Sequence, residues 1–312
     1  YRENSSNQIL GVPVSNTSGF NSRLINAGNI QNQGLEIQLR GTILQKSDYS
    51  WNASANFTRN DNEVKELAEG VETEILGQSR SGHTTIQARP GEPYGQIVGP
   101  SFERTDEGEV IFGEDGLPIV GEQKPLGNQE EDWSLGLTNT FQWKGVTLQA
   151  LFDVSWGGDM YSFTNAQAYQ TGKHKETLPG REQGYVIGDG VQRVTDGDGN
   201  VVELVENDVP VDPEDYYGYI GSNFAEPFVY DASYVRLRQL RLSYSLPQSA
   251  VEALPGVSST RLSLTGRNLW LIYDDVPNVD PSASYTTGAA HGLEHASLPQ
   301  TRNFGFDVQI RF

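Results

Sequence analysis

The chain has 312 residues, of which 36% are hydrophobic, 34 are glycine and 14 are tyrosine, a composition that suits strands and turns better than helices. It contains no cysteine, which excludes disulfides and thiolate sites, and no apolar run of about 18 residues, which excludes a helical membrane protein but not a membrane β-barrel. The formal net charge of −19 argues against nucleic acid as a partner, because a phosphate-binding surface should be basic.

The acidic residues are unevenly distributed. Of the 41, 17 lie in 61–132 and 14 in 157–231. Such concentrations of like charge are typical of solvated loops. The segments between and beyond them are less acidic and more strongly patterned.

The first patterned segments alternate apolar and polar residues with a period of two, as half-buried strands do. Apolar residues share one phase in 35–39 and again in 51–57, on either side of the polar turn 45–48. The segments 133–143 and 146–156 alternate in the same way and are separated only by Lys144-Gly145. Each pair is therefore predicted to form a β-hairpin.

The later strands contain irregularities. The apolar phase of 234–246 changes near Arg238-Gln239, which predicts a β-bulge. The strand predicted at 259–273 changes phase similarly, toward Leu269, Leu271 and Tyr273. The last nine residues alternate regularly, with the apolar phase ending at Phe312.

The connections between these seven predicted strands alternate in length. The short ones are 45–48, 144–145 and 247–257, whereas the long ones are about 60–131, 157–229 and 274–300, with 5–32 as a further loop before the first strand. Short turns on one side and long loops on the other are typical of outer-membrane barrels. We therefore expect an all-β fold of about seven or eight antiparallel strands, with an apolar outer face, a wet lumen and long extracellular loops.

Seven antiparallel strands cannot close into a ring alone, because the first and last would run in the same direction. We therefore expect residues 1–312 to be the C-terminal part of a single outer-membrane barrel domain, with the N-terminal barrel strands and plug outside this chain. Tyr1 would then end a preceding strand.

The sequence resembles the SusC/RagA-type TonB-dependent outer-membrane transporters of Bacteroidota along nearly its whole length. The matching stretches occur in the family's order: Gln31–Glu36 (QNQGLE), Gly127–Phe141 (GNQEEDWSLGLTNTF), Gly157-Gly158, Ala232–Pro247 (ASYVRLRQLRLSYSLP), Gly266–Leu269 (GRNL) with Asp280-Pro281, and Pro299–Phe312 (PQTRNFGFDVQIRF). Two positions depart from the family pattern. Glu131 precedes Asp132-Trp133 where a proline is usual, and Ser282 stands where an acidic residue often follows Asp-Pro.

The resemblance implies a non-enzymatic function, the import of large nutrients such as oligosaccharides or peptides across the bacterial outer membrane. It implies a SusD-like surface lipoprotein as an extracellular lid, and the TonB-ExbB-ExbD complex acting through the missing N-terminal part. The chain end resembles the signal read by the barrel assembly machinery, carried here by Phe304, Phe306 and Phe312, and the apolar face would contact outer-membrane lipid. No cofactor is implied.

Three local motifs suggest other chemistry. His291 to His295 matches H-x-x-E-H, but Gly292 interrupts the required helix and no third ligand follows, so we expect a loop. Asp196 to Asn200 resembles the opening of a calcium loop, but a β-turn fits better because the required glycine is absent. Glu130-Glu131 in so acidic a loop is more typical of solvated surface than of a glycosidase pair. We therefore predict no catalytic and no metal-binding residues.

Among the long loops, 157–229 has the features that best suit recognition, namely a glycine pair at its start and several aromatic residues. Gly157-Gly158 begins it as a possible hinge or a simple strand end, and its aromatic residues would either contact ligand and lid or pack the loop. The candidate contact residues are Trp156, Tyr161, Phe163, Tyr169 and Tyr185. Two alternatives to import remain: a barrel acting as a structural or adhesive surface platform, and a soluble carbohydrate-binding β module.

Overall fold

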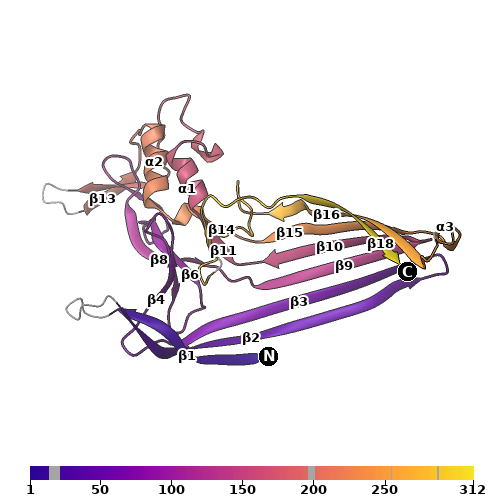
Figure 1. Cartoon of the computed structure of the whole chain (residues 1–312). Coiled ribbons are helices and arrows are strands. Elements are labelled where there is room, and N and C mark those ends of the chain that lie inside the picture. The colour runs from indigo at the N-terminus through magenta and orange to yellow at the C-terminus, as the bar shows by residue number, and fades with distance from the viewer. Residues whose placement is uncertain (14–21, 196–200, 254, 287) are drawn as a thin grey trace.

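The computed structural model describes residues 1–13, 22–195, 201–253, 255–286 and 288–312. Its main feature is one antiparallel sheet of eight long strands in the order β1-β2-β3-β9-β10-β15-β16-β18 (Figure 1). These strands are β1 Arg2–Pro13, β2 Ser22–Gln45, β3 Tyr49–Glu66, β9 Trp133–Trp143, β10 Val146–Trp156, β15 Tyr234–Ser245, β16 Ser259–Asp274 and β18 Asn303–Arg311. Seven of them were predicted from alternation.

The first strand, β1, corrects the prediction of a loop at 5–32. Arg2 to Pro13 pairs with Gln33 to Ser22 of β2, so the sheet has eight strands and its first and last strands run in opposite directions. The parity reasoning from seven strands is therefore wrong. Alternation missed this hairpin because both segments are rich in Ser, Asn and Gln, whose side chains pair across the strands, as Gln31 does with Asn4 at 2.8 Å.

Both predicted hairpin turns are present. Trp143 pairs with Val146, and the two turn residues have positive φ, 43° at Lys144 and 87° at Gly145. Two consecutive residues with positive φ define the type I′ turn, whose twist matches that of the flanking strands. The other turn joins Gln45 to Tyr49, with the Lys46 amide donating to the Tyr49 carbonyl at 2.9 Å.

The predicted bulge is present in β15. Leu151 of β10 faces Gln239 and Phe152 faces Leu237, so Arg238 is the extra residue. The phase predicted for the end of β16 is correct at Tyr273, which pairs with Val235, but wrong at Leu269 and Leu271, because the register also shifts around Asn268, which has a φ of 51°. Trp270 pairs with outward-facing Leu237, and it is Trp270 rather than Leu269 that is exposed.

One face of the sheet is apolar and exposed, as predicted. Its exposed side chains include Leu35, Leu39, Phe141, Leu148, Leu242, Leu264, Phe306, Val308 and Ile310. The opposite face is polar, with pairs such as Ser243 to Ser263 at 3.0 Å. This arrangement matches strands that turn one face to lipid and the other to a wet lumen.

Aromatic rings form a row across one end of the apolar face. Trp133 stacks on Phe57 and on Trp156 at 5.9 Å in both cases, and Trp156 stacks on Tyr273 at 5.7 Å. The row crosses neighbouring strands at one level, which is the geometry of an interfacial aromatic girdle.

Asn139, the polar residue that interrupts the apolar phase of β9, is satisfied locally. The Trp51 indole N–H donates to its side-chain oxygen at 3.0 Å. A buried or lipid-facing amide needs such a partner because lipid offers none. The pair therefore accommodates an asparagine within the apolar face.

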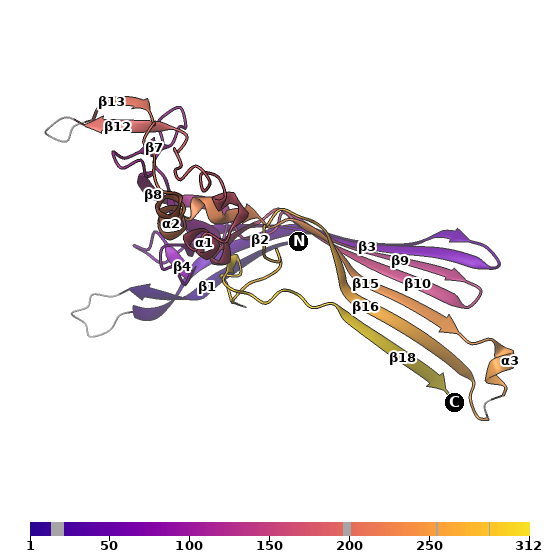
Figure 2. The same ribbon diagram turned by 90° about the horizontal axis from the view of Figure 1, so that it is seen from above.

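The two ends of the sheet differ in the way the sequence predicts. The hairpin turns, the short helix α3 Gln248–Val251 and the C-terminus lie at one end, the turn end, and the three long loops lie at the other, the loop end (Figures 1 and 2). The loops fold into further elements: β4 Glu74–Gln78, β5 Thr85–Ala88, β6 Gln96–Phe102, β7 Ile111–Phe112, β8 Val120–Asn128, β11 Asp159–Ser162, α1 Phe163–Gln170, η2 Lys175–Thr177, β12 Val191–Thr195, β13 Val201–Glu206, α2 Pro213–Asn223, η3 Glu226–Phe228, β14 Val229–Asp231 and β17 Leu293–Glu294. We call this assembly of the loops 67–132, 157–233 and 275–302 the cap.

The cap has its own hydrophobic core, which corrects the interpretation of the acidic segments as solvated loops. The core takes Ile86 and Ile97 from the first loop, Phe224 and Phe228 from the second, and Leu293 from the third. All five are completely buried. The acidic residues lie mainly around this core. In the described part of the chain, no helix has the length and apolar character needed to cross a membrane.

Candidate functional site

The predicted contact residues separate into buried and exposed groups. Tyr161 is completely buried in the cap core and Tyr169 is 9% exposed, while Phe163 packs at 4.9 Å against the ring of His295. These three side chains therefore pack within the cap, which is the second of the two roles considered for them. Trp156 and Tyr185 are 40% and 43% exposed, but Trp156 belongs to the aromatic row. Tyr185 is thus the predicted residue best placed to meet a ligand or partner.

Gly157 and Gly158 form a fixed strand end. Both have positive φ, at 77° and 76°, and a Cβ at 157 would lie 2.4 Å from a carboxylate oxygen of Asp132. The Gly157 amide donates to the Ser233 hydroxyl at 2.8 Å, and the Ala232 amide donates to the Gly158 carbonyl at 2.9 Å. These bonds tie the pair to its neighbours and favour the strand-end interpretation over a hinge.

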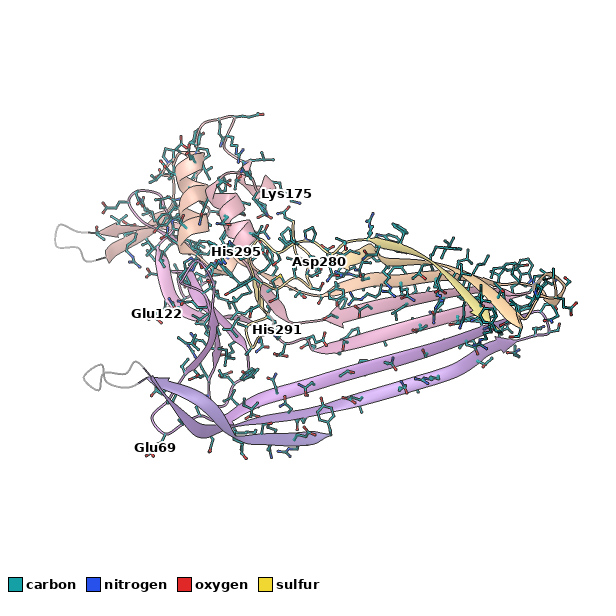
Figure 3. The ribbon with its side chains drawn as sticks, in the orientation of Figure 1. Glu69, Glu122, Lys175, Asp280, His291 and His295 are labelled. Atoms are coloured by element: carbon teal, nitrogen blue, oxygen red, sulfur yellow. The ribbon has the colours of Figure 1, made fainter. Side chains whose placement is uncertain are left out.

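The H-x-x-E-H motif lies in the third loop, as predicted, with a turn at His291-Gly292, the two-residue strand β17 and a bend at His295. Glu294 belongs to β17, is 1% exposed, and accepts hydrogen bonds from the hydroxyls of Ser162 at 2.7 Å and Thr164 at 2.8 Å. It therefore connects the third loop to the start of α1. Figure 3 places His291 and His295 between the long strands and the helices. The calcium-like segment 196–200 lies outside the described residues.

Asp280 anchors the third loop to the sheet, a role that sequence reasoning missed. The Arg236 guanidinium of β15 reaches its carboxylate at 2.6 Å, and the two side chains are only 3% and 11% exposed. Burial alone would raise the pKa of Asp280, but hydrogen bonds from Ser282 and the Arg236 charge hold this pKa below its ordinary value. Arg236 and Asp280 both belong to sequence stretches that carry the family resemblance, and this was the only signal in the sequence that could have indicated the anchor.

Carboxylates also gather where the cap meets the sheet. Asp159 of β11 accepts a bond from the Asn128 amide at 2.8 Å. Burial, and then the charges of Asp231 and Asp132, raise its pKa. No group of three or more His, Asp or Glu side chains among the described residues is arranged to hold a metal ion. Asp132, Asp159 and Asp231 therefore give this region a negative electrostatic potential and are not arranged as a metal site.

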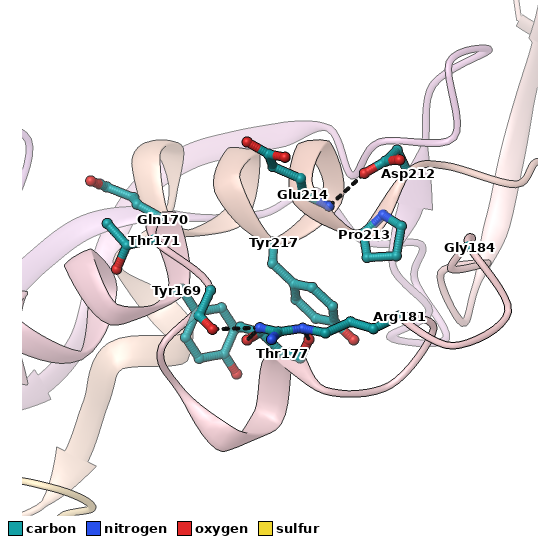
Figure 4. A pocket seen from close by; sticks show the side chains of 11 residues that line it. Tyr169, Gln170, Thr171, Thr177, Arg181, Gly184, Asp212, Pro213, Glu214 and Tyr217 are labelled. Carbon is teal, nitrogen blue, oxygen red and sulfur yellow. Dashed lines mark hydrogen bonds between the residues drawn. The ribbon is translucent and has the colours of Figure 1, made fainter.

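The cap contains a pocket of about 480 Å³ between the end of α1, the segment 171–184 and the start of α2 (Figure 4). This volume is within the range of small-molecule sites. The rings of Tyr169 and Tyr217 line it together with charged and polar groups. We call the segment 171–184 the strap. No sequence pattern predicted the pocket, because its lining residues come from two separate segments, 169–184 and 212–217.

The predicted assembly signal lies at the opposite end of the molecule. Phe304, Phe306 and Phe312 are 80%, 65% and 89% exposed, and β18 is an edge strand that pairs only with β16 among the described strands. These rings are thus accessible to a partner.

Comparison with known proteins gives consistent relatives, although no family model matches the sequence. TonB-dependent receptor P3 of Formosa agariphila is 24% identical over 96% of this chain and 30% of its own length. TonB-dependent receptor SusC of Bacteroides thetaiotaomicron is 26% identical over 35% of this chain and 10% of its own. The chain thus spans less than a third of these receptors.

Solved structures share the fold. The RagAB peptide transporter matches 99% of this chain and 32% of its own with a TM-score of 0.65 and 20% identity. The RagAB peptide importer in its closed-closed state gives a TM-score of 0.67 and 21% identity over the same shares. The long amphipathic sheet with its capped end is therefore part of the wall of a large transmembrane β-barrel. The sequence relatives and the fold agree: the chain is similar to the C-terminal part of SusC/RagA-type TonB-dependent receptors.

Proposed function

We propose that the receptor containing this chain imports large nutrients, oligosaccharides or peptides, across the bacterial outer membrane in a TonB-dependent manner. Residues 1–312 supply part of one barrel domain, and the remaining strands and the plug lie elsewhere in the receptor. The observation that carries the proposal is the whole-chain match in fold to a peptide importer, joined to sequence relatives that are TonB-dependent receptors.

The cap supports a role in recognition. We place it on the extracellular side, where it would meet cargo and a SusD-like surface lipoprotein acting as a lid, with exposed Tyr185 at its surface. TonB-ExbB-ExbD would act through the rest of the receptor. The barrel assembly machinery would read β18, and outer-membrane lipid would cover the apolar face.

The test is uptake by the intact bacterium. A strain lacking the receptor gene, complemented with the full receptor, is supplied with labelled oligosaccharide and peptide mixtures. Import predicts that cell-associated label depends on both the receptor and the proton gradient. Surface binding that persists without gradient-dependent uptake of any cargo would refute import.

A structural or adhesive surface platform is the alternative that this experiment distinguishes. In that case deletion reduces attachment of cells to a surface and leaves nutrient uptake unchanged. The third alternative, a soluble carbohydrate-binding β module, fits poorly with a row of exposed leucines and phenylalanines on one face. Extraction from membranes distinguishes a barrel from a soluble module, because only a barrel requires detergent.

A further inference from the structure

The pocket of the cap contains a positive charge that no carboxylate neutralises by contact. Arg181 donates from Nε to the Thr177 carbonyl at 2.6 Å and from Nη2 to the Thr177 hydroxyl and the Gly172 carbonyl. All three acceptors are neutral, and no ion pair of the described residues includes Arg181. Its Nη1 group therefore keeps both hydrogens available for a ligand.

Arg181 lies in strongly acidic surroundings, yet its hydrogen bonds go to neutral groups. The segments 61–132 and 157–231 together contain 31 acidic and nine basic residues. Arg104 and Arg193 of the cap each contact a glutamate. Arg181 is held instead by the strap, where Gly172 has a φ of 62° and a Cβ would lie 2.9 Å from Nη2. The strap thus fixes the guanidinium at the pocket wall.

A negatively charged residue of α2, Glu214, also lines the pocket. Glu214, in the first turn of this helix, is exposed, and its carboxylate has no hydrogen bond or ion pair among the described residues. Asp212 beside it caps the helix by accepting from the Glu214 amide at 2.8 Å. Figure 4 shows Tyr217 between Arg181 on one side and Asp212 and Glu214 on the other.

The pocket is therefore bipolar, with a guanidinium and a carboxylate that line one space without pairing with each other. A zwitterion matches this arrangement, because its carboxylate can take the free Nη1 hydrogens and its ammonium group can approach Glu214. A neutral sugar would leave both charges without a counter-charge. The tyrosine rings offer apolar contact for a side chain.

We propose that this pocket binds the charged termini of a short peptide, with Arg181 holding the carboxylate and Glu214 the ammonium group. The inference deepens the proposed function by favouring peptides over oligosaccharides as cargo recognised by the cap. It rests on the proposed placement of the cap where cargo arrives.

Equilibrium binding to the full receptor, purified in detergent, tests the proposal. The probes are trialanine, N-acetyltrialanine, trialanine amide and glucuronate, the last carrying a carboxylate without an ammonium group. We expect trialanine to bind at least tenfold more tightly than each of the other three, since each has lost one charged contact.

Variants locate the binding. Glu214→Gln should weaken trialanine binding about tenfold and leave N-acetyltrialanine unaffected, whereas Glu107→Gln, an exposed change in the first loop of the cap and outside the pocket lining, should alter neither. Arg181→Gln should weaken trialanine binding without changing that of trialanine amide. Because Arg181 also fixes the strap, the Glu214 variant keeps the test independent of local folding.

Equal binding of trialanine and its two blocked forms, or trialanine binding unaffected by Glu214→Gln and Arg181→Gln, would overturn the proposal. Tighter binding of glucuronate than of trialanine would also overturn it and would assign the pocket to acidic sugars. Because binding by the purified receptor needs no TonB, it stays measurable if uptake fails, so failure of import and failure of the pocket are distinguishable.

Discussion

An arginine in place of Phe152 tests which face of the sheet meets lipid. Phe152 pairs with Leu137 of β9 and Leu237 of β15, so its side chain lies on the apolar face. The neighbouring residue, Leu151, pairs with Thr138 and Gln239 on the polar face. Arginine at these adjacent positions therefore compares lipid with lumen at one depth.

The magnitude follows from strand geometry. A strand tilted by about 40° gains about 2.5 Å of height per residue, so the ten steps from Trp133 to Trp143 span about 25 Å, the usual height of the apolar band. Phe152 lies four residues from Trp156, about 10 Å inside the aromatic row and close to the midplane. Phe152→Arg should thus cost about 2–4 kcal/mol of folding free energy, whereas Leu148→Arg, nearer the turn end, should cost about 0–1 kcal/mol.

Urea unfolding of the full receptor in lipid vesicles measures these costs, with heat modifiability on gels as the assay of the folded barrel. Leu151→Arg should be tolerated because its side chain meets a wet lumen. Equal destabilisation by Leu151→Arg and Phe152→Arg, or a larger cost at Leu148 than at Phe152, would contradict the face and depth assigned here.

Three further predictions concern other parts of the sheet. Deletion of Phe312 should lower the amount of folded receptor in the outer membrane, and an unchanged heat-modifiable band would contradict a role in assembly. Trp51→Phe should cost about 1–3 kcal/mol in urea unfolding, because it leaves the Asn139 amide unsatisfied, and the double change with Asn139→Ala should recover most of that loss. Because its folded-state pKa is lowered, Asp280 stabilises the third loop above the ordinary carboxyl pKa, and this contribution is lost as the pH falls through the lowered value. Limited proteolysis of 275–302 should therefore accelerate in acid. Asp280→Asn leaves the buried Arg236 charge without its partner, at a cost of about 3–5 kcal/mol, and should make cleavage fast at every pH. If the Asp280→Asn receptor is cleaved as slowly as the wild type at neutral pH, Asp280 does not anchor the loop.

The regular strands could be predicted from the sequence because an apolar face against lipid imposes alternation directly on neighbouring residues. This held for 146–156 and for the bulge at Arg238. It failed at β1, where polar side chains pair across the hairpin, and at the end of β16, where the irregular backbone at Asn268 moved the outward face to Trp270.

The cap could not be predicted in the same way, because its core depends on contacts between distant segments. Tyr161 looked like a contact residue in the sequence, yet it pairs beside Leu293, more than 130 residues later, and is completely buried. Arg181 and Glu214 carried no motif. Only the fold places these two on one pocket.

The shared core of the cap has a consequence for exchanging specificity between related receptors. Ile97, Phe228 and Leu293 come from three different loops but are buried against one cluster. A chimera that receives one foreign loop would leave the two resident loops with a mismatched interior, and the cost of the cavity or clash would fall on segments that were never altered. The three loops should therefore be inherited and engineered as a set, while the hairpin turns at the other end can vary one at a time.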